Sequence, residues 1–350
     1  MLALAVLQLA ACAAPSYYVQ AASGHLDLMR QREDITGLID AVSTDPELAR
    51  ELALSVEIRE FAITRLLLPD NGSYTQFVQT GQDAVTWNVV AAPEFSLDPR
   101  RWCFLVSGCV SYRGYFKRKD AERLAGKLAA RDYDTAISPA IAYSTLGWFE
   151  DPLLDTMFRY SDGQLAAFIF HELAHQALYV SGDTAFSESY ASFIEQKGVM
   201  LWLESSSRAE ELADWQKSRQ AGLQFNALLK ETRTKLSELY DSGLPKVQMR
   251  KDKSLLFENL AARYELLVNL EWGGKSYFGG LLAGEMNNAS LALIDSYRAG
   301  TCAFEMLYRE AQQDMARFQR LAAARAGLGK EQRRAWLNQP CEVIASGGDL

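Results

Sequence analysis

Apolar residues recur at helical spacing over two long parts of the chain. Between His25 and Leu68 they follow the 3.6-residue period of amphipathic helices, and Asp45-Pro46 marks a helix start because proline fits the first turn. From Ser187 onward the pattern is again helical. One long helix is predicted over Ala209–Tyr240, ending at Asp241-Ser242-Gly243, and another is predicted from Lys253. Helix is therefore expected to predominate in this chain.

A region between the two helical parts has the pattern of strands. Strand-like runs cover residues 85–92, 102–106 and 109–112, and a further extended stretch covers residues 134–148. An amphipathic helix is predicted over Lys117–Arg131. This order of elements predicts an α+β fold, predominantly helical, with a small mixed sheet that precedes the helix described next and a helical C-terminal half.

A strongly apolar helix, expected over residues 165–180, carries three ionisable side chains. The five residues from His171 to His175 read H-E-x-x-H and contain two of the chain's three histidines. Residues four apart share one face of a helix, so both imidazoles can bind one Zn²⁺ ion. Glu172 stands beside the first ligand, where it can act as general base on a zinc-bound water. The helical context therefore favours a zinc-peptidase site.

A catalytic zinc ion needs a third protein ligand and one open position. The apolar helix is expected to end near Ser181-Gly182, and a second helix follows. Glu188 lies early in that second helix, so an antiparallel return would bring its carboxylate to the two histidines. We predict Glu188 as the third ligand. Glu195 lies two turns later on the same face, as the alternative ligand or as the partner of a histidine N–H.

These residues resemble a known family. The run His-Glu-Leu-Ala-His-Gln over residues 171–176, with Gly182–Phe186 and Glu188-Ser189, is similar to the putative aminopeptidase family of bacterial lipoproteins. Four earlier stretches resemble the same family: Asp70–Tyr74, Trp87–Glu94, Tyr112–Phe116 and Tyr143–Phe149. The resemblance covers nearly the whole chain and implies a zincin-like fold and a zinc peptidase with a glutamate third ligand. Ser187 departs from the family's pattern, which has Asn before the glutamate.

The first residues have the pattern of an export signal. Met1–Ala11 is apolar and too short to span a bilayer, and Leu9-Ala10-Ala11-Cys12 resembles a bacterial lipobox, in which the cysteine is lipidated. By resemblance to lipoprotein sorting, Ala13 favours the outer membrane. We therefore expect Cys12 to anchor the protein to a membrane, facing the periplasm; the alternative is an ordinary signal peptide with a chance cysteine.

Length and charge restrict the architecture and the partners. The 350 residues, 49% of them hydrophobic, suffice for one large domain or two intimate ones. We expect residues 1–23 to be the signal, lipoprotein segment and linker, and residues 24–350 to be the peptidase. Within it, residues 24–180 form the α+β part and residues 181–350 the helical part. A net charge of −8 argues against a nucleic-acid partner, and the sequence indicates no oligomeric state.

Four further cysteines are candidates for disulfides, because disulfides persist in exported proteins. Cys103 and Cys109 flank a turn signal and would close a small loop, and Cys302 and Cys341 would then tie the C-terminal tail to a helix. Three pairings are compatible with four cysteines.

Substrate binding is expected near the strand-like residues that precede the zinc helix. Ile141–Leu146, which contains Tyr143, is the candidate edge strand for pairing with a peptide substrate. Glu150 follows this stretch and is the candidate anchor for the ammonium group of a free N-terminus. Asp151 is read either as a second anchor or, with Pro152, as the cap of the next helix. Glu94 is another candidate anchor.

The sequence leaves open both the residue that would stabilise the oxyanion and the choice among several functions. Tyr143, Tyr277 and Tyr297 are candidates for stabilising the oxyanion, and His25 is expected to be a surface histidine. The main prediction is a zinc-dependent aminopeptidase of the bacterial cell envelope. The alternatives are a zinc endopeptidase or other amide hydrolase, and a non-catalytic scaffold with a structural zinc. A scaffold would need a fourth protein ligand and would give Glu172 no role.

Overall fold

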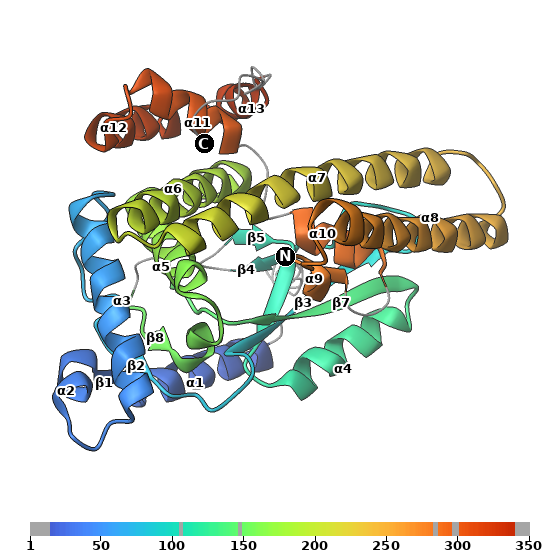
Figure 1. Cartoon of the computed structure of the whole chain (residues 1–350). Helices are drawn as coiled ribbons and strands as arrows, with labels where there is room; N and C mark the ends of the chain where they lie inside the picture. The colour runs from blue at the N-terminus through green and yellow to red at the C-terminus, as the bar shows by residue number, and fades with distance from the viewer. Residues whose placement is uncertain (1–14, 105–107, 146–148, 283–285, 296–300, 340–350) are drawn as a thin grey trace, which may run out of the picture.

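In the part of the chain that the structure describes, most residues are helical and the strands form three small sheets (Figure 1). The computed structural model describes residues 15–104, 108–145, 149–282, 286–295 and 301–339. The first helices among these residues are α1 (Pro15–Arg30), α2 (Ile35–Asp40) and α3 (Pro46–Thr64). Asp45 caps α3 by accepting hydrogen bonds from two backbone N–H groups, and Pro46 occupies the first turn, as predicted. The predicted α+β class, with helix predominant, is confirmed.

Two of the sheets have three strands each. In the first, β2 (Gln76–Val78) lies between β1 (Glu33–Asp34), which is antiparallel to it, and β8 (Leu153–Leu154), which is parallel to it. The second is antiparallel, with the order β6-β3-β7. Its strands are β3 (Thr86–Pro93), β6 (Tyr112–Tyr115) and β7 (Tyr133–Ala140). The predicted strands over residues 85–92 and 134–148 thus correspond to β3 and, in part, to β7.

The β6-β3-β7 sheet is covered on both faces. Helix α4 (Arg118–Ala129) packs on one face, where Ala121 and Ala125 lie in a hydrophobic cluster with Val89 and Ala91 of β3. On the other face, α10 (Asn288–Asp295) packs against Val90. Residues 89–92 of β3 are all buried, because successive side chains of a strand point to opposite faces and both faces of this sheet are covered.

The predicted edge strand over Ile141–Leu146 is wrong in the part that the structure describes. Strand β7 ends at Ala140, and residues 141–145 follow it without strand structure; Leu146 lies outside the described residues. The physical reason is that the backbone N–H and the hydroxyl of Thr145 donate to the Asp151 carboxylate, at 2.9 and 2.7 Å, and not to a neighbouring strand. Strand β7 itself is the edge of its sheet.

The centre of the molecule is a helical hairpin formed by α5 (Asp162–Ala177) and α6 (Thr184–Ser205). Ser161 starts α5 with a capping box, and Asp183 caps α6. Helix α5 ends at Ala177, earlier than the predicted end near Ser181-Gly182. It ends there because Leu178 is extended and the N–H of Val180 donates to the Ser187 hydroxyl at 3.1 Å.

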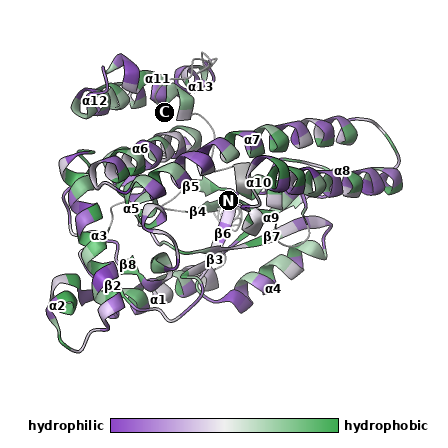
Figure 2. Ribbon diagram, in the orientation of Figure 1, coloured by the Kyte–Doolittle hydropathy of each residue, from purple (hydrophilic) through white to green (hydrophobic). Residues whose placement is uncertain are grey.

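The C-terminal half is helical, as predicted. Helices α7 (Ala209–Tyr240) and α8 (Lys246–Leu266) form a long hairpin, and each carries both hydrophobic and hydrophilic residues (Figure 2). Helix α8 begins earlier than the predicted Lys253. Short helices complete this half: α9 (Gly279–Leu282), α11 (Thr301–Glu310), α12 (Met315–Ala326) and α13 (Lys330–Leu337). One hydrophobic core runs from Leu28 to Trp336 and thus includes residues from both expected parts of the peptidase.

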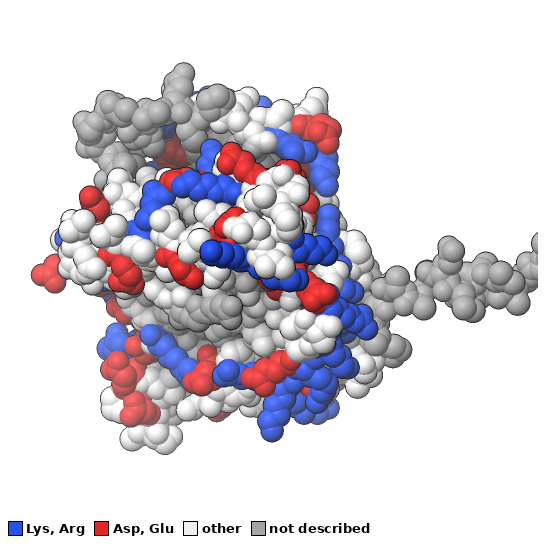
Figure 3. All heavy atoms as spheres, turned by 90° about the vertical axis from the view of Figure 1, so that its right-hand side faces the viewer, with Lys and Arg blue, Asp and Glu red and all other residues white. Residues whose placement is uncertain are grey.

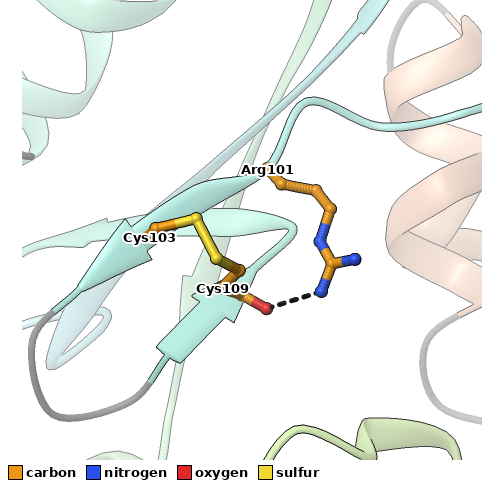
Figure 4. Close-up of a disulfide and its surroundings, with 3 residues drawn as sticks. All are labelled: Arg101, Cys103 and Cys109. Atoms are coloured by element: carbon orange, nitrogen blue, oxygen red, sulfur yellow. Dashed lines mark hydrogen bonds between the residues drawn. A yellow bond between two sulfur atoms is a disulfide. The ribbon is translucent and has the colours of Figure 1, made fainter. Parts of the chain in front are cut away.

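The hairpin of β4 (Trp102–Phe104) and β5 (Gly108–Val110) is closed by a disulfide between Cys103 and Cys109 (Figure 4). The two cysteines lie opposite each other in the register of the hairpin, with 3.9 Å between their Cα atoms. Cys302 lies in α11, but Cys341 is outside the described residues, as is Cys12, so the second pairing stays a prediction. Within the described ranges, no helix is both long and apolar enough to cross a membrane.

Candidate metal centre

Helices α5 and α6 bring two imidazoles and one carboxylate together. The Nε2 atoms of His171 and His175 lie 3.2 Å apart. The Glu188 carboxylate lies 3.4 Å from His171 Nε2 and 3.6 Å from His175 Nε2. The three side chains come from positions i and i+4 of α5 and from the second turn of α6, as the spacing in the sequence suggested. They are the cluster with metal-binding spacing among the described residues.

These distances match the spacing of ligands around a tetrahedral zinc ion. Ligand atoms at the corners of a tetrahedron, each about 2.05 Å from the ion, are separated by about 3.3 Å. The two Nε2 atoms are 3.2 Å apart. The Glu188 carboxylate approaches His171 Nε2 with Oε2, at 3.4 Å, and His175 Nε2 with its other oxygen, Oε1, at 3.6 Å. Two imidazole nitrogens and a carboxylate oxygen are also a donor set that zinc prefers. The residues present therefore fit a zinc ion.

Glu195 contacts the outer nitrogen of His171. Its carboxylate lies 2.9 Å from His171 Nδ1 and accepts a hydrogen bond from it. In the neutral imidazole this bond places the hydrogen on Nδ1, so that Nε2, which faces the cluster, could bind a metal ion. Of the two readings of Glu195, the geometry favours the partner of a histidine N–H over the third ligand. His175 Nδ1 is buried and has no hydrogen-bond partner among the described residues.

The electrostatics of the cluster hold Glu188 ionised. Burial alone would raise the pKa of the Glu188 carboxyl, but hydrogen bonds with His171 and His175 outweigh it and lower the pKa to about 2. Burial would likewise lower the pKa of His171, but Glu188 and Glu195 raise it well above its ordinary value. Two carboxylates around two imidazoles thus provide the negative charge that a divalent cation would balance.

Glu172 follows His171 on α5. Its carboxylate interacts electrostatically with two buried acidic groups, the Tyr74 phenol and the Asp151 carboxyl. Tyr74 is 1% exposed, and its hydroxyl has no hydrogen-bond partner within the described part of the chain. Burial raises the pKa of this phenol, and the Glu172 and Asp151 carboxylates raise it further. The phenol therefore stays protonated near Glu172.

Asp151 joins α5 to the segments before it. The residues after Pro152 form β8, and Leu154 precedes the next helical turn, so the reading of Asp151 with Pro152 as a helix cap is wrong. Its carboxylate accepts hydrogen bonds from Ser144, from Thr145 and, at 3.1 Å, from Gln176 Nε2 at the end of α5. Gln176 also contacts Ser73 and accepts from Asn71. Because Asp151 is 1% exposed and saturated with donors, it is not available to a substrate ammonium group.

Replacing Asp151 by Asn should change how stability depends on pH. Burial raises the pKa of this carboxyl to about 6, from 3.8, so between these values the folded chain binds more protons than the unfolded chain. Stability from this group is present below pH 4 and is lost as pH rises through 6. In metal-free protein, denaturant unfolding should show the advantage of wild type over Asp151→Asn shrinking by up to about 3 kcal/mol from pH 4 to 7.

The exposed Asp40→Asn variant serves as the control for this measurement, since Asp40 ends α2 at the surface. Its difference from wild type should stay constant over the same pH range. A difference between Asp151→Asn and wild type that does not vary with pH would show that the Asp151 carboxyl titrates normally.

A family model described as "Putative aminopeptidase" matches residues 16–337. The chain belongs to this family. The match extends from α1 through α13 and includes His171, Glu172, His175 and Glu188. No curated protein and no solved structure matches the chain.

In this member of the aminopeptidase family, the two candidate anchors for a substrate ammonium group, Glu94 and Glu150, have different surroundings. Glu94 is engaged by Arg250, whose Nη2 donates to it at 2.9 Å, and the pKa of Glu94 is lowered by this hydrogen bond. Glu150 is exposed, and its side chain lies over Gly72, where an added Cβ would come within 2.2 Å of it. Gly72 adjoins Asn71, which donates to Gln176 beside His175. Of the two candidate anchors, Glu150 is therefore the one that these contacts connect to the candidate metal site.

The structure describes two of the three tyrosines that were predicted as candidates for stabilising the oxyanion. Both of these, Tyr143 and Tyr277, contact residues other than those of the metal cluster. The Tyr143 hydroxyl is paired with His25 Nδ1 at 3.1 Å, so His25 is half-buried and not a surface histidine. Tyr277 packs in a separate hydrophobic cluster with Trp272, and Tyr297 lies outside the described residues.

Sequence reasoning missed Tyr179, which lies beside the candidate metal ligand His175. Its ring centre is 6.1 Å from that of His175, and the side chain is 40% exposed. Burial raises the pKa of the Tyr179 phenol, and the nearby Glu188 carboxylate raises it further, so the hydroxyl is a donor at neutral pH. Helical spacing does not account for this position, because α5 ends at Ala177 and Tyr179 follows the extended Leu178.

Proposed function

We propose that this protein is a zinc-dependent aminopeptidase. The observation that carries the proposal is the cluster of His171, His175 and Glu188, whose donor atoms approach one another at 3.2 to 3.6 Å on the hairpin that also bears Glu172. A site with three protein ligands leaves a fourth position open, which is the arrangement of catalytic zinc sites. The family's description supports the peptidase activity.

Each residue of the site would have its own role in peptide-bond hydrolysis. Zinc, when bound, would polarise the scissile carbonyl and acidify a water. Glu172 takes a proton from the attacking water as its oxygen bonds to the carbonyl carbon, and passes the proton to the nitrogen as the C–N bond breaks. Tyr179 donates a hydrogen bond to the oxygen that gains charge. Glu195 holds the His171 ring through Nδ1.

A free N-terminus is the proposed feature of the substrate, with Glu150 as the group that binds its ammonium. The test compares one peptide with a free amine and the same peptide acetylated. We expect release of the first residue from the free peptide only, because acetylation removes the charge that a carboxylate binds. Loss of this preference in Glu150→Gln, with Glu94→Gln as the matched control, would assign the anchor. Equal cleavage of both peptides at an internal bond would indicate an endopeptidase.

The non-catalytic scaffold is the less favoured alternative. A closed structural site needs four protein ligands, and the cluster found in the described part of the chain contains three. A zinc-loaded protein that cleaves no peptide in a library would favour the scaffold over the peptidase.

We further propose that Cys12 carries a lipid that anchors the protein to the outer membrane, facing the periplasm. The support is the lipobox-like sequence before Cys12. Cys12→Ser should move the protein from the membrane fraction to the soluble fraction, with peptidase activity retained. A wild-type protein without acyl chains by mass spectrometry would contradict the lipoprotein proposal and leave the zinc site untouched.

A further inference from the structure

Positive charge is concentrated on one helix of an acidic protein. Residues 98–132 contain nine Lys or Arg and four Asp or Glu, a net charge of +5, in a chain whose net charge is −8. Six of these basic side chains are exposed on α4 and at its two ends, and together they are called the basic face: Lys117, Arg118, Lys119, Arg123, Lys127 and Arg131. Figure 3 shows Lys and Arg gathered in the lower right part of its view.

The fold directs the basic face away from the protein. The opposite side of α4, with Ala121, Ala125 and Leu128, is buried against the β6-β3-β7 sheet. Arg118 and Arg123 pair with Glu122 and Asp120 of the same helix. The other four basic side chains form no ion pair with any residue that the structure describes, and their charge is directed at solvent.

The beginning of α1 is packed into the same layer as α4. Tyr17 belongs to the hydrophobic cluster that contains Ala121, stacks on Phe104 at 5.1 Å, and lies 4.1 Å below the Arg113 guanidinium. Gln20 joins α1 to β6 by donating to Gly114 O at 3.4 Å and accepting from the Phe116 N–H at 3.3 Å. These contacts fix the first turns of α1 beside the strand that precedes α4.

The packing of α1 brings the start of this helix, and with it the proposed lipid anchor at Cys12, near the basic face. Cys12 precedes Pro15 by three residues, which span at most about 11 Å. A lipid at Cys12 would therefore insert into a membrane near the layer that carries the basic face. Val19 on α1 and Tyr112 on β6 are 68% and 46% exposed, and they add apolar contact area to the same region.

We propose that the basic face docks on a membrane surface that carries anionic lipid headgroups. A cluster of Lys and Arg is attracted to such a surface within about one Debye length, roughly 8 Å at physiological salt. This docking goes beyond the peptidase activity and does not require the lipid.

Vesicle binding tests the proposal without the lipid. The full chain with Cys12→Ser is sedimented with phosphatidylcholine vesicles and with vesicles in which about a third of the lipid is phosphatidylglycerol. We expect binding to the anionic vesicles only, and its loss at high salt. Lys119→Glu, Lys127→Glu and Arg131→Glu together should weaken binding roughly a hundredfold, since each basic residue near the surface contributes roughly fivefold.

A control with the same change in net charge separates docking from general repulsion. Arg317→Glu, Arg320→Glu and Arg334→Glu reverse three exposed residues on α12 and α13, which lie across the molecule from α4 (Figure 1). This triple variant should keep most of the binding. If the α4 triple variant does not fold, the milder Lys119→Gln, Lys127→Gln, Arg131→Gln variant should show a smaller loss.

Three results would overturn the proposal. Equal binding to neutral and anionic vesicles would remove the role of charge, and equal losses in the α4 and control variants would remove the role of this face. Binding of the basic face to an acidic polypeptide, without binding to anionic vesicles, would identify a protein partner instead. None of these outcomes bears on zinc content or peptidase activity, so the proposed function is tested separately.

Discussion

Glu172→Gln should retain zinc and lower peptidase turnover by roughly two to four orders of magnitude. The amide has nearly the shape of the carboxylate but cannot take a proton from water. The proposed metal ligands are three other side chains, and His171 keeps its hydrogen bond to Glu195. The measurement pairs metal content by atomic spectroscopy with kcat on a free peptide.

The matched control is Glu60→Gln, an exposed glutamate of α3. It should leave both metal content and turnover unchanged. If Glu172→Gln lost zinc, and its remaining activity followed the metal content, Glu172 would be a ligand and the role of general base would be wrong.

Glu188→Ala should have the largest effect on metal binding. Removing one of three ligands should weaken zinc affinity by more than roughly a hundredfold, whereas Glu195→Ala should cost about 10–100-fold because it acts through His171 Nδ1. Competition with a chelator of known affinity measures both. The exposed Glu204→Ala, on the same helix, serves as the control.

The order of these effects distinguishes the two glutamates. A larger loss in Glu195→Ala than in Glu188→Ala would reverse the assignment, since both carboxylates face His171 in the structure. Unchanged affinity in both variants would show that α6 contributes nothing to the ion.

The sequence predicted the helices better than the short strands. Residues four apart must share a helix face, so the placement of His171 and His175 followed from spacing alone. Ala209–Tyr240 was also predicted with its observed bounds, because a long amphipathic period ends at a clear Gly signal. Extended residues such as 141–145 were misread because strand pairing depends on distant partners, and here Asp151 provides the hydrogen bonds instead.

The polar surroundings of the site were the least predictable part. The contacts of Gln176 with Ser73 and Asn71 join residues more than 100 positions apart, and no local pattern encodes them. The same holds for Tyr74, which adopts a φ of 61° and is buried with its hydroxyl unpartnered among the described residues. Local spacing in the sequence was enough to predict which side chains form the candidate metal cluster. The residues around the cluster depend on tertiary packing, which local spacing does not show.

The α5–α6 hairpin has a consequence for the order of folding. The His171–Glu195 contact spans 24 positions, so closing that loop costs little entropy, whereas Arg333 of α13 contacts Asp183 across 150 positions. Contacts between near neighbours in sequence form faster than distant ones. We therefore expect the metal-binding residues to assemble before α13 docks on the start of α6, so that an ion can be captured by a chain that is still incomplete.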